Sequence, residues 1–270
     1  MKIRLLTLCW IITSAAGGAL AERAQVSVTG DPAAQGGSLP WAVAASLSEP
    51  TDRYPHDVLG RIPSFTRLSV TAQVCSGCAA PVITGHLTLT APLVFEDVAP
   101  RLWDVTGDGR PEVVVVQSHA ELGARLTVWA LREADATDAP LFSLLAATDY
   151  IGTRFRWLAP LGQGDFTGDG KTDIAYVETP HLGRTLRLVG LEEDRLVERG
   201  SLAGVTNHRI GEEVIAGGVR DCGGAAEAVL ASSDWRRIVA VSWDSGGLIS
   251  RDLGPLAAQP DWAKALTCPR

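Results

Sequence analysis

The sequence predicts an all-β protein, a β-propeller built of four-stranded antiparallel blades. From residue 41 onward, short apolar or alternating runs that are typical of strands are separated by turn residues about every ten positions. No run of apolar residues sustains the 3.6-residue period of a helix. An acidic loop of the same pattern occurs twice, 61 residues apart. A repeat at a fixed period indicates supersecondary units that bury their faces against one another, as propeller blades do.

The two acidic loops read D-x-T-G-D-G-x-x-[D/E]. The first covers residues 104–112 and the second covers residues 165–173, and apolar runs at 113–116 and 174–177 follow them. A carboxylate-rich loop held between two strands suggests a cation site. The loops therefore serve both as the marker of the repeat and as the first candidate for a functional site.

Aligning the chain on these loops reveals three units of four predicted strands that start about 60 residues apart. A weaker unit, with strands at 65–70 and 82–89, precedes them, so four blades are recognisable. A fifth, irregular blade remains an alternative, as does closure of the ring by residues 41–47. A β-sandwich would explain the short strands but not the recurring loop. The predicted strands are 101–104, 112–117, 125–131 and 141–145, then 161–165, 174–178, 185–191 and 195–198, and finally 216–221, 227–230, 237–243 and 247–251.

Each acidic loop offers the oxygen ligands that Ca²⁺ prefers. Places 1, 5 and 9 carry carboxylates, place 3 carries a hydroxyl, and place 7 can contribute only a backbone carbonyl. Glycines at place 6 permit the sharp turn that would aim these groups inward. The alternative is a common Asp-Gly turn whose carboxylates are merely solvated. The predicted ligands are Asp104, Thr106, Asp108, Arg110 and Glu112 in the first loop, and Asp165, Thr167, Asp169, Lys171 and Asp173 in the second.

The loops and their spacing resemble FG-GAP or VCBS-type repeats, which are found in integrin α-subunit propellers and in many exported bacterial proteins. The resemblance covers roughly residues 54–254. It implies a propeller that carries one or two structural Ca²⁺ ions, but it implies no activity. The third loop, at 221–227, is shortened, and the corresponding segment at 60–64 has no acidic residue. We expect neither of these two to bind a cation.

Composition excludes some classes of protein. The chain has 270 residues, 46% of them hydrophobic and 20% charged, so it can bury a core and is not a disordered chain. The net charge is −7 and no block of lysine and arginine stands out, which argues against nucleic acid as a partner.

The N-terminus reads as a Sec-type signal peptide over residues 1–21. A basic start precedes a short apolar run, and an A-x-A cleavage site ends at Ala21. An uncleaved anchor is the alternative. Residues 22–40 are predicted to be a flexible lead-in, and residues 41–268 a single propeller domain. We therefore expect a periplasmic or secreted protein with no membrane span after cleavage.

The cysteines predict disulfide bonds. Cleavage would remove Cys9 and leave four cysteines, which allow three connectivities. We expect a local bond between Cys75 and Cys78, which leaves Cys222 to pair with Cys268 in the oxidising compartment. Zinc or redox chemistry at the C-x-x-C pair is the alternative, although no second C-x-x-C accompanies it.

No nucleophile elbow, zincin motif, P-loop or dinucleotide-binding motif occurs in the chain. The tryptophans at 103, 129, 157, 235 and 243 lie in or beside predicted strands, which indicates packing between blades. The connectors between predicted blades also repeat, and in a propeller they gather on one face around the centre. Ion pairing between blades is the alternative role for their polar residues. The possible binding face comprises His56, Asp57, Arg154, Arg156, His208, Arg209, Glu212 and Glu213.

Two functions follow from these observations. The first is a non-catalytic, calcium-stabilised scaffold that binds a protein or a small ligand. The second is a periplasmic hydrolase or lyase that uses the central pocket. A deep pocket in which carboxylates and histidines converge would favour the enzyme, whereas a flat or salt-bridged mouth would favour the scaffold.

Overall fold

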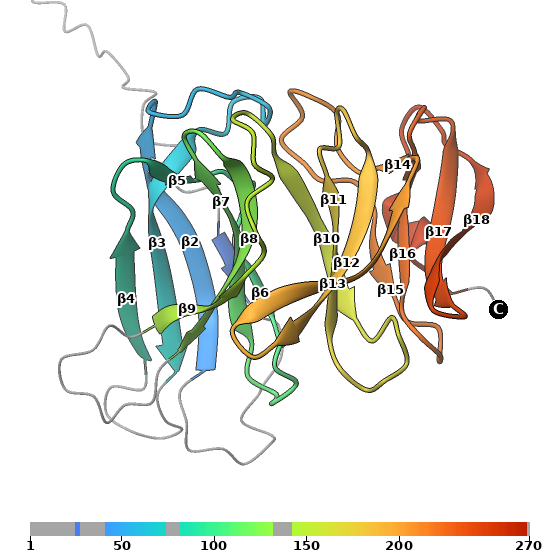
Figure 1. The fold of residues 1–270 in the computed structure, drawn as a ribbon, viewed down its shortest axis with the longest axis horizontal. Coiled ribbons are helices and arrows are strands. Elements are labelled where there is room, and N and C mark those ends of the chain that lie inside the picture. The colour runs from blue at the N-terminus through green and yellow to red at the C-terminus, as the bar shows by residue number, and fades with distance from the viewer. Residues whose placement is uncertain (1–24, 28–40, 74–81, 132–141, 269–270) are drawn as a thin grey trace, which may run out of the picture.

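The computed structural model describes residues 25–27, 41–73, 82–131 and 142–268 and shows an all-β chain (Figure 1). The predicted signal peptide and the pair Cys75 and Cys78 lie outside these residues. In the part of the chain described, no helix is long and apolar enough to cross a membrane.

The N-terminal part is an antiparallel sheet that corresponds to the weaker predicted unit. Its long central strand β3 pairs with β2 on one side and with β4 on the other. A short strand, β1, adds to β2, and β5 links β3 to the next unit. The bounds are β1 (Gln25–Ser27), β2 (Trp41–Thr51), β3 (Ser64–Gln73), β4 (Val82–Thr88) and β5 (Leu93–Phe95).

Three four-stranded antiparallel meanders follow, each at the place of a predicted unit. Every predicted strand of these units is present, with bounds that differ by a few residues. The two-residue strand β14 (Val205–Thr206) also pairs with β16. The meanders are β6 (Arg101–Trp103), β7 (Glu112–His119), β8 (Gly123–Leu131) and β9 (Phe142–Ala147); β10 (Leu158–Gly164), β11 (Asp173–Glu178), β12 (Thr185–Glu192) and β13 (Arg195–Ala203); and β15 (Gly218–Arg220), β16 (Glu227–Ser232), β17 (Arg237–Asp244) and β18 (Gly247–Pro255).

The meanders are joined only loosely into sheets. A single residue pair, Arg195 with Ala147, connects β13 to β9, and another, Phe65 with Phe95, connects β3 to β5. These contacts place β1 to β13 in one curled sheet, while β14 to β18 form a second sheet. Within the described residues the sheets do not close into a ring, so the propeller and its number of blades stay predictions.

The hydrophobic core lies between neighbouring meanders, and β7 shows why. Val114 and Val116 pack toward β10 and β11, whereas Val113 and Val115 pack toward the N-terminal sheet. Successive side chains of a strand point to opposite faces, so a strand between two layers needs apolar residues at every position. This explains the unbroken run of four valines. A third cluster fills the space between the second and third meanders.

The C-terminus is held against the third meander. Cys222 and Cys268 form the predicted disulfide, which spans 46 residues. Arg220 donates from Nη1 to the carbonyl oxygens of Ala265, at 2.9 Å, and Thr267, at 3.3 Å. A one-turn helix, α1 (Trp262–Ala265), shortly precedes Cys268 in the chain. This helix was not predicted from the sequence. A helix this short carries too little periodic pattern to be recognised.

Candidate functional site

The two acidic loops adopt the same hydrogen-bonded turn. In the first loop, the carboxylate of Asp104 accepts backbone N–H bonds from places 4, 5 and 6 at 2.9, 3.1 and 2.9 Å. In the second loop, Asp165 accepts the equivalent bonds at 2.7, 3.1 and 2.9 Å. The place-6 glycines have φ angles of 82° at Gly109 and 80° at Gly170. A side chain there would be strained, which is why both loops keep glycine at this place.

The last carboxylate of each loop is buried at the start of a strand. Glu112 accepts N–H bonds from Val105, at 2.8 Å, and Thr106, at 3.2 Å. Burial raises the pKa of both Glu112 and Asp173. Backbone N–H bonds to each carboxylate, from Val105 and Thr106 and from Phe166 and Thr167, oppose the shift. The loops differ at place 5, because Arg110 pairs with Asp108 at 2.5 Å, while Lys171 donates only its backbone N–H to Asp169.

The donor set of each loop, all oxygen and largely anionic, fits a hard cation such as Ca²⁺. The side chains, however, are not gathered around a common point. Among the described residues, no three of the histidine, cysteine, aspartate and glutamate side chains lie close enough together to hold a metal ion. Cation binding therefore requires the carboxylates at places 5 and 9 to turn toward the carboxylate at place 1.

The shortened third loop uses other means to hold its carboxylates. Strand pairing places Glu227 opposite Arg220, just as Glu112 lies opposite Trp103. Glu227 bonds to Arg220 at 2.7 Å and to Arg251 at 2.9 Å. Two guanidinium groups thus compensate the charge of Glu227, the carboxylate at the place that a bound cation would neutralise in the other two loops. Within the same loop, Cys222 forms the disulfide with Cys268.

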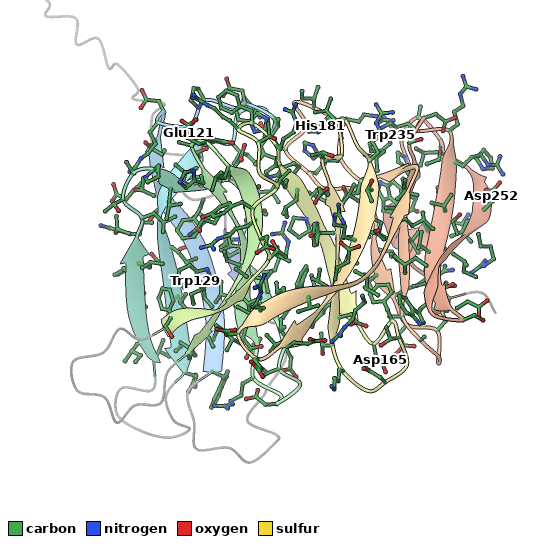
Figure 2. All side chains as sticks on the ribbon, in the orientation of Figure 1. Glu121, Trp129, Asp165, His181, Trp235 and Asp252 are labelled. Carbon is green, nitrogen blue, oxygen red and sulfur yellow. A yellow bond between two sulfur atoms is a disulfide. The ribbon has the colours of Figure 1, made fainter. Side chains whose placement is uncertain are left out.

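The residues of the predicted binding face lie at the end of the molecule opposite the second acidic loop. Figure 2 shows His181 and Trp235 at one end and Asp165 at the other. His56 and Arg156 line one cavity. His208 does not line this cavity but contacts His181, which does. Asp57 lines a neighbouring cavity. The remaining members make ion pairs or ring contacts: Arg209 with Glu212 (3.6 Å) and Trp235 (4.0 Å), Glu213 with Arg61 (2.7 Å), and Arg154 with Phe155 (4.5 Å).

The first cavity, which we name the histidine pocket, has a volume of about 270 Å³. Its walls combine aromatic, aliphatic and imidazole side chains, and no carboxylate lines it. Trp157 stacks on His181 with an interplanar angle of 13°, and Phe155 stacks on His56 with an angle of 22°. The lining residues are His56, Val58, Phe155, Arg156, Trp157, Thr179, His181, Leu182 and Ile210.

A buried carboxylate supports one side of the histidine pocket. Glu96 is only 3% exposed and accepts hydrogen bonds from His56 Nδ1 at 2.7 Å and Ser118 Oγ at 2.5 Å. Burial raises the pKa of Glu96, and the bond to His56 opposes this. The Nε1–H of Trp157 donates to the backbone oxygen of Glu96 at 2.8 Å. These contacts fix the orientation of the His56 ring and of the indole together.

A chain of two histidines supports the other side. His208 is 1% exposed, and its Nε2 lies 2.9 Å from the carbonyl oxygen of Glu212. His181 Nε2 lies 2.8 Å from His208 Nδ1. Burial lowers the pKa of His208, and burial together with the nearby His208 and His56 lowers the pKa of His181 to about 4. Both rings are therefore neutral at physiological pH.

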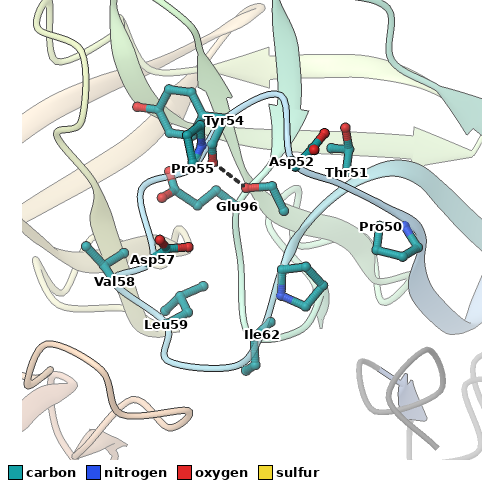
Figure 3. Close-up of a pocket in the computed structure, with 12 residues that line it drawn as sticks. Pro50, Thr51, Asp52, Tyr54, Pro55, Asp57, Val58, Leu59, Ile62 and Glu96 are labelled. Carbon is teal, nitrogen blue, oxygen red and sulfur yellow. Dashed lines mark hydrogen bonds between the residues drawn. The ribbon is translucent and has the colours of Figure 1, made fainter. Parts of the chain in front are cut away.

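The neighbouring cavity, of about 460 Å³, lies under the loop between β2 and β3 (Figure 3). Asp52, Asp57 and Glu96 line it together with Pro50, Pro55 and Pro63. Glu96 thus lies between the two cavities, since it lines this one and bonds to a histidine of the other.

Stability should fall as the pH is lowered from about 7 to about 4, and His181 should account for part of the loss. The pKa of His181 is lowered from 6.5 to about 4 in the folded protein, so below pH 6.5 the unfolded chain binds a proton that the folded chain does not. Chemical denaturation at several pH values checks this. His181→Gln should flatten the dependence, whereas the exposed control His86→Gln should leave it unchanged; equal profiles for both variants would contradict the assignment.

Sequence reasoning identified His56 and His208 but missed their partners. Glu96 and Ser118 lie 40 and 62 residues from His56 and belong to no repeated motif. The predicted binding face does not include His181, and Trp157 was predicted to be a packing residue. Trp157 does pack in the core, at 2% exposure, but it also lines the histidine pocket. His181 lies in the turn between β11 and β12 rather than in a connector between meanders, so the recurring connectors gave no signal for it.

A scan of the chain against protein-family models gives no match, and neither does a comparison with curated proteins. The FG-GAP or VCBS resemblance therefore rests on the loops and their spacing.

Proposed function

We propose that this chain is an exported, calcium-stabilised β-propeller scaffold that binds a small ligand without catalysing a reaction. The observation that carries the proposal is the histidine pocket, in which two imidazoles and a guanidinium meet aromatic and aliphatic walls. Ligand sites combine a mostly apolar surface with a few oriented polar groups in this way. The repeated four-stranded meanders with a shared acidic loop support the propeller part of the proposal.

The arrangement around Glu96 favours binding over nucleophilic catalysis. Ser118 is fully buried and donates its hydroxyl hydrogen to Glu96 rather than to a histidine. A serine nucleophile needs access to the substrate, and Ser118 has none.

Binding can be tested with a panel of small aromatic and aliphatic compounds while the ring nitrogens of the five histidines are followed by ¹⁵N NMR. We expect a ligand to shift the signals of His56 and His181 and to leave those of the exposed His86 unchanged. Leu182→Asp, which places a charge at the mouth, should weaken the response. A panel in which no compound shifts His56 or His181 would refute ligand binding at this pocket.

A second candidate function is a hydrolase or lyase, and the His56–Glu96 pair specifically favours it. A carboxylate that binds one imidazole nitrogen orients the ring and leaves the other nitrogen available as a general base. Turnover of a compound identified in the binding panel, lost in His56→Gln, would establish this activity. Binding without turnover would leave the scaffold as the function.

Chelation of Ca²⁺ should lower the melting temperature. Extracellular sites of this type bind at about 10⁻⁴ to 10⁻³ M, so 10 mM Ca²⁺ would stabilise the fold by about 1.4 to 2.7 kcal/mol per site. Differential scanning calorimetry with Ca²⁺ and with EGTA measures the difference. Asp104→Ala combined with Asp165→Ala should abolish it. The matched control is Asp221→Ala in the third loop, which should retain it; an identical melting temperature in Ca²⁺ and EGTA would refute the calcium sites.

A further inference from the structure

The hydrogen-bond network determines which nitrogens of the histidine pocket donate and which accept. A carbonyl oxygen only accepts, so the His208 nitrogen that faces Glu212 carries a proton. The other nitrogen of the neutral His208 ring must then accept from His181 Nε2–H. His181 Nδ1 is consequently an unprotonated acceptor, and it has no hydrogen-bond partner among the described residues.

The opposite wall presents the imidazole of His56 and the guanidinium of Arg156, of which Arg156 is the donor. His56 Nδ1 lies 2.7 Å from Glu96 Oε1, so this ring nitrogen is already used in a hydrogen bond. Arg156 lines the pocket and forms no ion pair with a described carboxylate; among the described residues its guanidinium makes one hydrogen bond, from Nη1 to the Phe155 oxygen at 3.1 Å.

The remaining surface is apolar and open to solvent at the mouth. Trp157 forms the inner wall, and Leu182 and Ile210, which are 63% and 69% exposed, form the rim. Large aliphatic side chains this exposed at a cavity mouth indicate a surface that an apolar group covers.

We propose that the histidine pocket binds a small carboxylate with an apolar body and a hydroxyl group next to the carboxylate. The carboxylate would accept from Arg156, the hydroxyl would donate to His181 Nδ1, and the apolar body would pack on Trp157, Leu182 and Ile210. This inference rests on the proposed ligand-binding function and specifies the class of ligand.

Three compounds of similar shape separate these contacts. Mandelate carries both the carboxylate and the adjacent hydroxyl, phenylacetate lacks the hydroxyl, and phenylacetamide also lacks the charge. Isothermal titration of the full chain should show mandelate binding about fivefold or more tightly than phenylacetate, and phenylacetate about tenfold more tightly than phenylacetamide.

Variants assign each preference to a residue. Arg156→Gln should remove the advantage of phenylacetate over phenylacetamide, while Arg156→Lys, which keeps the charge, should retain part of it. His181→Phe should remove the advantage of mandelate over phenylacetate and leave phenylacetate binding in place. Equal affinities of the chain for phenylacetate and phenylacetamide, or unchanged selectivity in Arg156→Gln, would overturn the proposed class.

The histidine NMR panel separates this failure from failure of the proposed function. If neutral compounds shift His56 and His181 but the carboxylates do not bind more tightly, the ligand class is wrong and ligand binding stands. If no compound of either kind perturbs these histidines, both proposals are wrong.

Discussion

Replacing Cys222 and Cys268 together by serine is expected to lower the free energy of unfolding by about 4 kcal/mol. The disulfide closes a loop that spans 46 residues, and in the chain-entropy model its loss releases the conformational freedom of that loop in the unfolded state. The folded state should loosen as well. The C-terminal segment would then be held to the third meander mainly by the hydrogen bonds that Arg220 makes to Ala265 and Thr267.

Urea denaturation of the oxidised protein and of the serine variant measures this difference. The matched control replaces Cys75 and Cys78, whose predicted bond would close only a short loop, and it should cost much less. Hydrogen exchange should show faster opening of residues 262–268 in the Cys222→Ser, Cys268→Ser variant. A variant as stable as the native chain would show that the disulfide contributes nothing to the stability of the third meander.

The substitution His56→Leu should destabilise the fold by about 3 kcal/mol, because it leaves the buried carboxyl group of Glu96 without its hydrogen bond to His56. Glu96 is 3% exposed, so water cannot replace the lost hydrogen bond. The cost should fall when Glu96 is also replaced by leucine, since removing both members of a buried hydrogen-bonded pair leaves no unsatisfied polar group.

A double-mutant cycle over His56→Leu and Glu96→Leu, followed by urea denaturation, measures the coupling. The surface pair of Arg237 and Asp252, at 2.5 Å and half exposed, is the matched control, and Arg237→Leu should cost only about 0–1 kcal/mol. Additive effects of His56→Leu and Glu96→Leu would mean that the two side chains are not coupled in the folded protein.

Prediction from sequence succeeded where the pattern is local. The strand at Glu112–His119 could be recognised because a strand buried on both faces needs an unbroken run of apolar residues, here valines. The turn at Asp104 could be recognised because its glycines and carboxylates are close together in the chain. The Cys222–Cys268 bond was predicted once Cys75 and Cys78 were taken as a local pair. Each of these inferences uses residue types that have few alternative uses in a β-rich chain.

The histidine pocket could be predicted only in part. His56 and His208 were identified from the recurring connectors, but the pocket depends on contacts between residues far apart in sequence. Glu96 meets His56 across 40 residues, and His181 meets His208 across 27. No sequence period links the two members of such a pair. Only the packing of neighbouring meanders brings the two residues together.

The sequence by itself determined the all-β class, the four-stranded units, the twin acidic turns and one disulfide, because alternating burial and turn chemistry act over a few residues. Tertiary structure alone decided that the sheets stay open within the described residues and that Glu96 is buried against His56. It also decided that two further histidines form a neutral pair beside Trp157. Burial and charge at a site depend on which surfaces pack together, and that is a property of the whole fold rather than of any segment.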